Sequence, residues 1–288
     1  MAKQPAKRTI KRKPARRRKK KKTYLKYILL AVLLLTLVGT GFYLKQKIVF
    51  YYAMHLKPKF IHKKLHNPEE ETLRIDRIIA DNNDKVFGFD ISHYQRREDI
   101  EWDSLNIANG SIPLQFVILR ATMGNRNADK HFGEFWKKSR EKELIRGAYH
   151  FYRADEDPVI QASNYLANVK LERGDLPPIL DIEKIPRRKS REKLVEDLKT
   201  WCRITEKAYG KRPIIYTYYH YYKDYLKGDF DGYRLWLANY NDVPAPSPED
   251  EWTFWQFTEN GIVHGINSKV DLNVYNGGIW SLKLLTLN

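Results

Sequence analysis

From residue 86 onward, short apolar runs alternate with segments of helical periodicity, and this alternation constrains the fold more than any other feature. Eight runs are strand candidates, at 86–92, 115–122, 145–153, 177–183, 212–219, 234–241, 251–258 and 269–277. Amphipathic helices are expected over 129–143, 156–172 and 189–209. Strand–helix alternation predicts a parallel sheet, and eight strands in about 200 residues fit a compact barrel. The predicted class is α/β, a modified TIM-like (β/α) barrel whose last strands are irregular because the later connections are short.

Polar residues concentrate near the carboxyl ends of these runs, where a parallel barrel forms its active site. They are Asp90, Arg120, His150, Tyr152, Asp181, Glu183, Tyr216, Tyr218, Asn239, Tyr240 and Gln256. Asp271 is the exception, because it comes early in its run. Acids within apolar strands are costly unless they are paired or functional. The pattern therefore predicts a polar site on one face of the barrel.

The sharpest local signal is the pair Asp181 and Glu183 in the segment 177–183. Strand periodicity puts both side chains on one face, about 6.5 Å apart along the chain. Two neighbouring carboxyls are driven to different pKa values, so that one stays protonated while the other is ionised. Glycoside hydrolysis requires such a pair. The alternative is a strand end that forms salt bridges with the nearby Lys184 and Arg187.

A metal site is a second alternative for these acids. Asp90 and Asp271, together with the Asp-x-Glu pair and His93 or His150, offer ligands for Mg²⁺ or Zn²⁺. Within the predicted barrel domain no His-x-x-x-His or Cys-x-x-Cys spacing supports it, and neither a Gly-x-Ser-x-Gly motif nor a glycine-rich phosphate loop is present. We expect no metal and no cofactor.

The amino-terminal region differs sharply from the rest of the chain. Residues 1–26 contain 14 Lys or Arg and no acid, and 27–44 are 18 residues without a charge, about 27 Å as a helix. We expect a basic cytoplasmic tail at 1–26, a transmembrane helix at 27–44, a stalk or linker at 45–84 and the barrel domain at 85–288. A buried core helix and a cleavable signal peptide are the alternatives, but no clean Ala-x-Ala site follows the run.

Charge indicates orientation and partners. Basic residues are denser before the apolar run than after it, which predicts a single-pass protein of the bacterial cytoplasmic membrane with its amino terminus inside and its domain outside. The tail is also suited to anionic lipid. Outside the tail the chain has 38 basic and 35 acidic residues, so the domain lacks the basic excess of nucleic-acid-binding proteins. Its single cysteine, Cys202, is expected to be a buried apolar residue, and we expect a monomer.

With these motifs, the chain resembles the lysozyme-type muramidases of glycoside hydrolase family 25, over about 86–277. The resemblance rests on eight segments in order: GFDISHYQ (88–95), FVILRAT-x-G (116–124), GAYHFYR (147–153), PPILDIE (177–183), PIIYTYY (213–219), LWLANYN (235–241), WTFWQFTENGIVHGI (252–266) and VDLNVYNG (270–277). It implies a metal-independent enzyme that cleaves the β-1,4 bond between N-acetylmuramic acid and N-acetylglucosamine in peptidoglycan glycan strands. The apolar run at 27–44 would make this chain a membrane-anchored member, unlike the many freely secreted ones.

The resemblance also implies roles for single residues. Glu183 matches the general acid, and Asp181 matches the acid that steers the substrate's own N-acetyl group in a retaining route. Asp90 and Asp271 match the family's other acids of the groove. Five positions match substrate-facing residues: Tyr149, Tyr152, Tyr216, Trp236 and Gln256. One departure is Met123, where the family often has glutamate. A wall-binding module without catalysis and a metal-dependent hydrolase on a similar barrel remain the alternatives.

Overall fold

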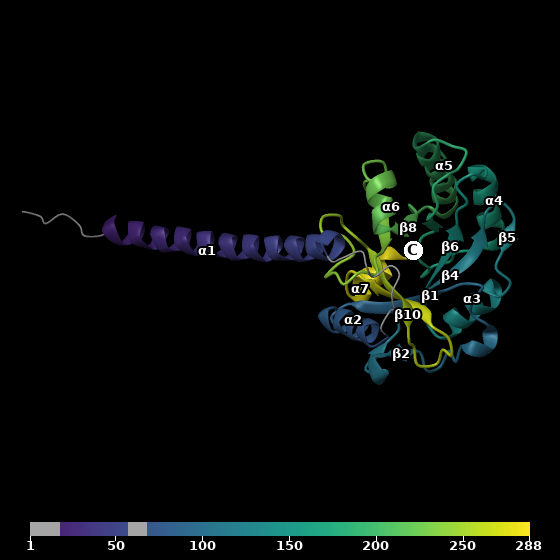
Figure 1. Ribbon diagram of the computed structural model, residues 1–288, viewed down its shortest axis with the longest axis horizontal. Coiled ribbons are helices and arrows are strands. Elements are labelled where there is room, and N and C mark those ends of the chain that lie inside the picture. Colours follow the sequence, from purple (N-terminus) through teal and green to yellow (C-terminus); the bar gives the residue numbers. More distant parts are fainter. Residues whose placement is uncertain (1–17, 57–67) are drawn as a thin grey trace, which may run out of the picture. The chain divides into compact units, whose positions relative to one another are not determined.

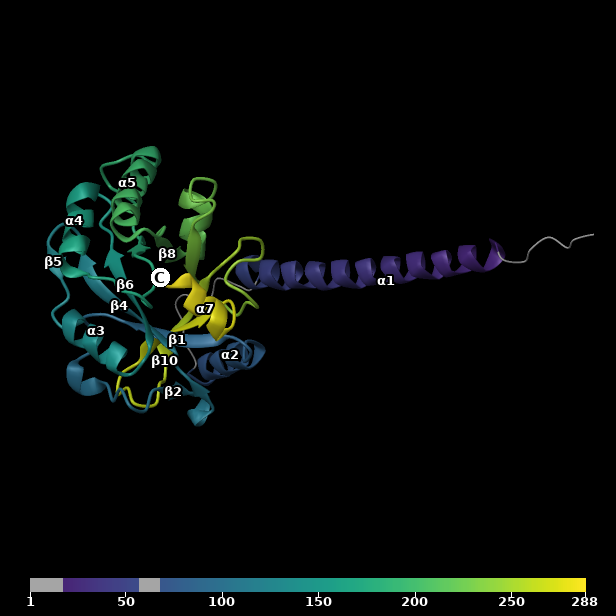
Figure 2. The ribbon, with the colours of Figure 1, turned by 180° about the vertical axis from the view of Figure 1, so that it is seen from behind.

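The structure is a computed structural model, and it describes residues 18–56 and 68–288. The chain divides into two compact units, Met1–Val49 and Phe50–Asn288. The second unit is a strand barrel surrounded by helices (Figures 1 and 2). The basic tail predicted for 1–26 lies mostly outside the described residues.

Helix α1, Arg18–Tyr51, forms the described part of the amino-terminal unit and continues two residues past its end, and a short π-helix, Tyr52–Leu56, follows. Within them Tyr24–Met54 contains an 18-residue stretch with a mean hydropathy of 2.2 and is long and apolar enough to cross a membrane. Length and composition are the basis for this, and a signal sequence would have the same properties. The predicted span at 27–44 lies inside this helix.

All eight predicted strands are present and form a closed ring in the order β1, β11, β10, β9, β8, β7, β6, β4 and back to β1. The strands of the ring are β1 (Val86–Ile91), β4 (Phe116–Met123), β6 (Ile145–Phe151), β7 (Ile179–Asp181), β8 (Ile214–Tyr218), β9 (Arg234–Ala238), β10 (Phe254–Gly261) and β11 (Val270–Tyr275). Short β5 (Asn127–Ala128) pairs with β4, and β2 (Asn106–Ile107) pairs with β3 (Ile112–Pro113).

The last strands are irregular, as the sequence predicts. Every neighbouring pair in the ring is parallel except the two that involve β11, which runs antiparallel to both β1 and β10. Strand β10 also changes register at two points along β11. The amino end of β11 therefore lies at the same end of the barrel as the carboxyl ends of the parallel strands.

The three predicted helices are present, with ends a few residues shorter than expected. They are α3 (Phe132–Glu141), α4 (Pro158–Asn168) and α5 (Arg191–Tyr209). Helix α4 begins where the Asp157 carboxylate accepts two backbone N–H groups, and α5 begins at the Ser190 cap and ends at Gly210 with φ of 70°. Shorter elements are η3 (Arg97–Asp99), η4 (Ala108–Gly110), α6 (Tyr219–Tyr221), η5 (Tyr222–Leu226) and α7 (Ile279–Leu285).

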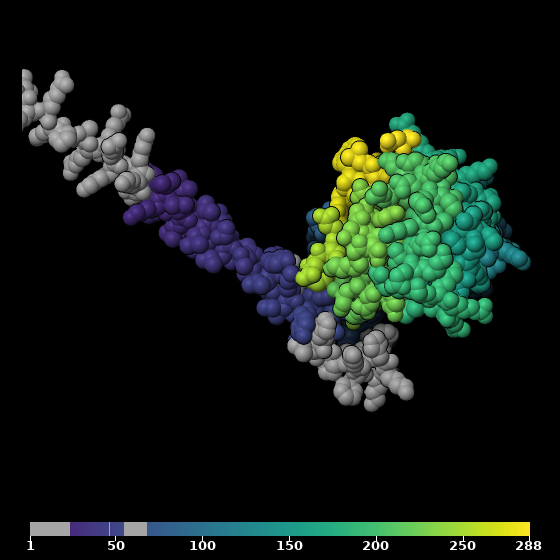
Figure 3. Space-filling model, turned by 90° about the horizontal axis from the view of Figure 1, so that it is seen from above, coloured from purple at the N-terminus to yellow at the C-terminus, as the bar shows by residue number. Residues whose placement is uncertain are grey.

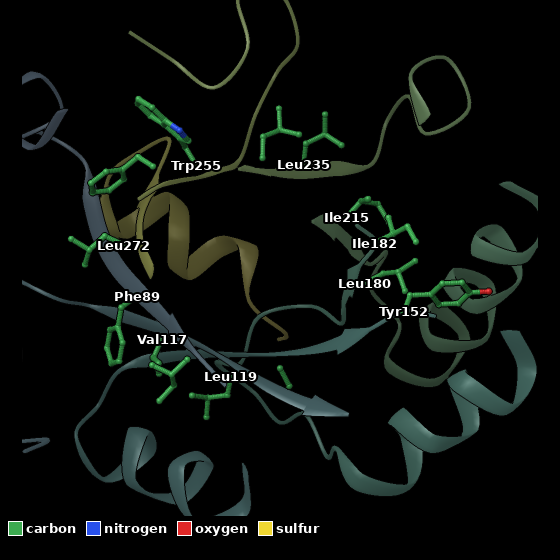
Figure 4. Close-up of a cluster of buried hydrophobic side chains, with 14 of the residues drawn as sticks. Phe89, Val117, Leu119, Tyr152, Leu180, Ile182, Ile215, Leu235, Trp255 and Leu272 are labelled. Atoms are coloured by element: carbon green, nitrogen blue, oxygen red, sulfur yellow. The ribbon is translucent and has the colours of Figure 1, made fainter. Parts of the chain in front are cut away.

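Alternate residues of each strand pack into two apolar layers. Phe116 and Ile118 of β4 lie in the cluster inside the barrel, whereas Val117 and Leu119 lie in the larger cluster between strands and helices. Figure 4 shows part of this outer cluster. The inner cluster also contains Leu282 of α7, so the last helix closes the amino-terminal end of the barrel.

Helix α2 (Pro68–Asp81) packs on the barrel although it lies within the predicted stalk at 45–84. Its Arg74 is buried and donates a 2.8 Å hydrogen bond from Nη1 to the Phe257 carbonyl, and Thr258 Oγ1 donates to Glu71 Oε1 at 2.9 Å. Both bonds lie where β10 changes register. The structure therefore differs from a free stalk over Pro68–Asp81. Of the rest of the predicted stalk, 45–56 form the end of α1 and the π-helix, and 57–67 lie outside the described residues.

Candidate active site

Four carboxyl groups meet at the end of the barrel where the parallel strands finish. Asp90 lies near the end of β1, Asp181 is the last residue of β7, and Glu183 follows two residues later. Asp271 reaches the same place from the beginning of β11, where it is the antiparallel partner of Asp90. The position of Asp271 early in its run is explained by the reversed direction of that strand.

Strand β7 ends at Asp181, so Glu183 is not part of the strand that the sequence predicts for 177–183. The chain nevertheless stays extended past that point, because the Ile182 N–H donates to the Tyr216 carbonyl at 3.0 Å and Thr217 Oγ1 donates to the Ile182 carbonyl at 2.6 Å. These bonds to β8 hold the segment that carries Glu183.

Gln256 on β10 is the centre of a buried hydrogen-bond network. Its Nε2 donates to Asp90 Oδ2 at 2.8 Å and to Asp271 Oδ2 at 3.2 Å. Its Oε1 accepts from the hydroxyls of Tyr216, at 2.7 Å, and Tyr240. With both ends of its amide in use, Gln256 is fixed in one orientation and holds the two acids.

Asn273 supports the same network from β11. Its Nδ2 donates to Asp90 Oδ2 at 2.7 Å, and its Oδ1 accepts from Trp236 Nε1 at 2.7 Å. Asn273 is not among the site residues predicted from the sequence. The available signal was its spacing of two from Asp271, which puts both side chains on the same face of a strand.

Three of the predicted substrate-facing aromatics form the floor beneath the acids. The rings of Tyr216 and Trp236 are 4.4 Å apart between centroids, and those of Tyr149 and Trp236 are 6.3 Å apart. All three belong to the inner cluster and are buried. Tyr218 is more accessible, with 36% of its surface exposed, and its ring meets that of the half-buried Tyr240 edge to face at 6.2 Å. These two tyrosines offer more accessible aromatic surface than the predicted three.

Tyr152 and His150 lie elsewhere, in the outer layer between the strands and the helices. Tyr152 is fully buried in the outer cluster, and its hydroxyl has no hydrogen-bond partner among the described residues. Hydrogen bonds join His150 Nδ1 to Thr122 Oγ1, at 2.7 Å, and Nε2 to Gln161 Oε1, at 3.1 Å. Burial lowers the pKa of His150 to about 4. The Tyr152 backbone N–H donates to the Asp181 carbonyl at 2.7 Å, but its side chain points into the outer cluster and does not join the four acids.

Burial raises the pKa of all four acids above the ordinary range. The pKa of Asp90 rises to about 7, although Asn273 and Gln256 donate to it and lower the pKa. The pKa of Asp271 rises to about 9, with the neighbouring Asp90 as a further cause. A hydrogen bond between these two carboxyls lowers the pKa of Asp90 and raises that of Asp271, so the pair holds a proton near neutral pH.

Asp181 and Glu183 differ in their surroundings. Burial and the nearby Glu183 raise the pKa of Asp181 well above its usual range, and Asp181 Oδ1 is buried without a hydrogen-bond partner among the described residues. Glu183 is half-buried; burial raises its pKa, and Lys184 opposes the rise. The more accessible carboxyl is thus Glu183, and it retains its proton above the usual pH range of a glutamic acid.

Arg120 and Met123, two residues that the sequence singled out, have partners other than the four acids. Arg120 does not pair with any of the four acids; its Nε donates to Asp129 at 2.9 Å. Met123, the departure in the motif, has its sulfur 3.7 Å from Nη2 of Arg153, which is ion-paired with Glu156. Within 18–56 and 68–288, no group of three or more His, Cys, Asp or Glu side chains is arranged to hold a metal ion.

Comparisons with known proteins give matches over the barrel domain. The family model described as "Glycosyl hydrolases family 25" matches residues 89–266, a segment that contains Asp90, Asp181 and Glu183 and ends shortly before Asp271. The uncharacterized protein YegX of Escherichia coli K12 is 33% identical over 244 residues, which are 84% of this chain and 87% of YegX. Lysozyme M1 of Streptomyces globisporus is 29% identical over 218 residues, 70% of this chain and 72% of the relative.

Solved structures show the same fold. A family 25 glycosyl hydrolase from Bacillus anthracis matches with a TM-score of 0.63 and 29% identity, over 71% of this chain and 95% of that chain. A family 25 lysozyme from Aspergillus fumigatus matches with a TM-score of 0.60 and 27% identity, over 71% of this chain and all of that chain. With the family model covering more than half of its length, this chain belongs to glycosyl hydrolase family 25 and is a glycoside hydrolase.

Proposed function

We propose that this chain is a peptidoglycan muramidase that cleaves the β-1,4 bond between N-acetylmuramic acid and N-acetylglucosamine. The observation that carries the proposal is the meeting of Asp181 and Glu183 with Asp90 and Asp271 at one end of the barrel. The relatives support the substrate class, since they include lysozymes and an N,O-diacetylmuramidase from Arthroderma benhamiae.

In this proposal Glu183 is the general acid. Its raised pKa keeps a proton on the carboxyl, and its partial exposure lets that carboxyl reach the oxygen of the scissile bond. As the bond breaks, the proton passes to the leaving sugar. The same carboxylate then accepts a proton from the water that completes hydrolysis.

Asp181 assists from the opposite side of the reacting sugar. The N-acetyl oxygen of the substrate attacks the anomeric carbon, and the N–H of the same group donates to Asp181, whose Oδ1 has no protein partner among the described residues. This step requires the form in which Glu183 holds a proton and Asp181 does not, because an ionised Asp181 stabilises the positive charge that develops on the acetamido group. Asp90 and Asp271 do not reach as far, because Gln256 and Asn273 hold them in the floor, and their role is to position the site.

We also propose that Tyr24–Met54 contains an uncleaved anchor, with 1–26 in the cytoplasm, 45–67 as the connection and 68–288 as a monomeric catalytic unit outside the membrane. Support comes from the length and hydropathy of the segment and from the excess of basic residues before it. The Pro68–Asp81 helix is included in the catalytic unit because Arg74 and Glu71 bind β10.

The test uses purified full-length protein and peptidoglycan. Glu183→Gln is expected to lower kcat by at least about 10²-fold, because it removes the proton donor, while thermal unfolding stays close to that of the unchanged protein. Glu196→Gln, an exposed acid on α5, is the matched control and should keep full activity.

Mass spectrometry of the products identifies the bond, since muramidase action leaves muramic acid at the new reducing ends. Reducing-end glucosamine would replace the proposed bond with another, and full activity of Glu183→Gln would remove Glu183 from its role. Binding of peptidoglycan without any product would favour a wall-binding module, and activity that EDTA abolishes and a divalent ion restores would favour metal-dependent hydrolysis.

A further inference from the structure

Helix α7 is apolar on both of its sides. Its inner residues, Ile279, Leu282 and Leu285, pack against the inside of the barrel. Its outer side carries Trp280 and Leu284, four positions apart and therefore on one face of the helix, with 77% and 80% of their surfaces exposed. Polar residues of α7 are also exposed on this side, and an exposed tryptophan–leucine pair among polar neighbours is suited to a further contact.

Basic residues surround this exposed pair. Lys283 Nζ lies over the Trp280 ring at 5.4 Å from its centroid. Beside α7 is a pocket of about 380 Å³ that Lys211, Arg212 and Arg234 line, together with Leu284. One acid, Glu206, also lines it and lies 3.6 Å from Arg212 Nε. Neither Lys211 nor Arg234 is ion-paired with an acid of the described chain, so the pocket has a net positive charge.

The chemistry of this surface specifies its partner. Arginine and lysine bind phosphate, and a pocket of this volume admits one polar head group. Tryptophan and leucine next to long basic side chains are the residues that enter the boundary between lipid head groups and acyl chains. The surface made of Trp280, Lys283 and Leu284 with Lys211, Arg212 and Arg234 is called the basal face. The yellow C-terminal segment that includes α7 lies at the surface of the domain in Figure 3.

We propose that the basal face docks on a bilayer that contains anionic phospholipid, with a lipid phosphate in the pocket and with Trp280 and Leu284 in the interface. The basal face lies at the amino ends of the strands, because Arg212 precedes β8, Arg234 begins β9 and α7 closes that end of the barrel. The four acids lie at the opposite end. A docked domain therefore presents its active site away from the lipid.

The experiment places a polarity-sensitive fluorophore on Leu284→Cys in the full-length chain, reconstituted in vesicles. The native Cys202 is fully buried, and labelling of the unchanged protein provides the blank. We expect a blue shift of the fluorophore when phosphatidylglycerol is present and none in phosphatidylcholine alone. The same label at Ile262→Cys is the matched control, since Ile262 is 76% exposed at the other end of the barrel, and it should report water in both vesicles.

Charge removal is the second arm. Changing Lys211, Arg212 and Arg234 together to Gln in the Leu284→Cys protein should abolish the blue shift, because each cation near an anionic surface contributes about a fivefold factor in the docking equilibrium. These three side chains are at least partly exposed, so the thermal midpoint should stay unchanged and serves as the folding check. High salt should have the same effect on docking as the triple change.

Several results would overturn the proposal. They are a label at position 284 that reports water in anionic vesicles, a triple variant that keeps the blue shift, and a shift of equal size at position 262. A blue shift without vesicles that grows with protein concentration would assign the basal face to a second copy of the chain. A blue shift caused by inorganic phosphate alone would assign the pocket to a soluble anion.

Discussion

Replacement of Gln256 by Leu tests whether the buried network holds the active site together. The change keeps the size of the side chain but removes two donated and two accepted hydrogen bonds, to Asp90, Asp271, Tyr216 and Tyr240. A buried group that loses its partner costs about 1–3 kcal/mol, and the half-buried Tyr240 can turn to water, so a total loss of about 3–5 kcal/mol is expected. At about 2–4 °C per kcal/mol, the thermal midpoint should fall by roughly 6–20 °C.

The Gln256→Leu change should also alter the activity of the enzyme that remains folded. Gln256 lowers the pKa of Asp90 by donating to it, so without Gln256 the pKa of Asp90 rises further and the geometry of the Asp90–Asp271 pair is released. The pH profile of kcat, measured at a temperature where the variant is folded, should therefore shift.

Gln161→Leu is a matched control in the outer layer. Gln161 is also fully buried, and its amide contacts His150 and both the N–H and the carbonyl of Arg153 and none of the four acids. It should lose stability to a comparable degree and keep the pH profile of the unchanged enzyme. The reasoning is refuted if Gln256→Leu leaves the thermal midpoint unchanged, or if the two variants have the same pH profile.

Two further predictions concern pH and topology. Between pH 6.5 and 9 Asp271 is ionised in the unfolded chain but keeps its proton in the folded chain, because its folded pKa is about 9. This difference should lower the free energy of unfolding by about 1.4 kcal/mol per pH unit. Asp271→Asn should flatten this slope in urea unfolding, and an unchanged slope would contradict the raised pKa. Below pH 6.5 stability is lost as the pH falls, because His150, with a folded pKa of about 4, takes up a proton more readily in the unfolded chain. The pH range for the Asp271 measurement therefore begins at 6.5. For topology, protease added outside intact spheroplasts should degrade 68–288 and leave an amino-terminal epitope protected, whereas release of the whole domain into the medium would indicate a cleaved signal peptide.

Strand periodicity partly predicts which polar residues lie inside the barrel and which lie between the strands and the helices. Tyr149 and Tyr152 are three positions apart, and a period of two sends such residues to opposite faces. The structure places Tyr149 inside the barrel and Tyr152 outside it. The resemblance to the family assigned both to the substrate, although the local pattern already separated them.

The sequence by itself determined the strands of the ring and the three helices α3, α4 and α5, because strand and helix periodicity are local properties of the chain. It was sufficient to predict eight strands, three long helices and the pair of acids at the end of β7. The tertiary structure decided what depends on distant segments. The reversed direction of β11 brings Asp271 beside Asp90, and helix α2 joins the barrel through Arg74. The raised pKa values likewise arise because β1, β7, β10 and β11 together exclude water from the acids, and no single segment encodes that.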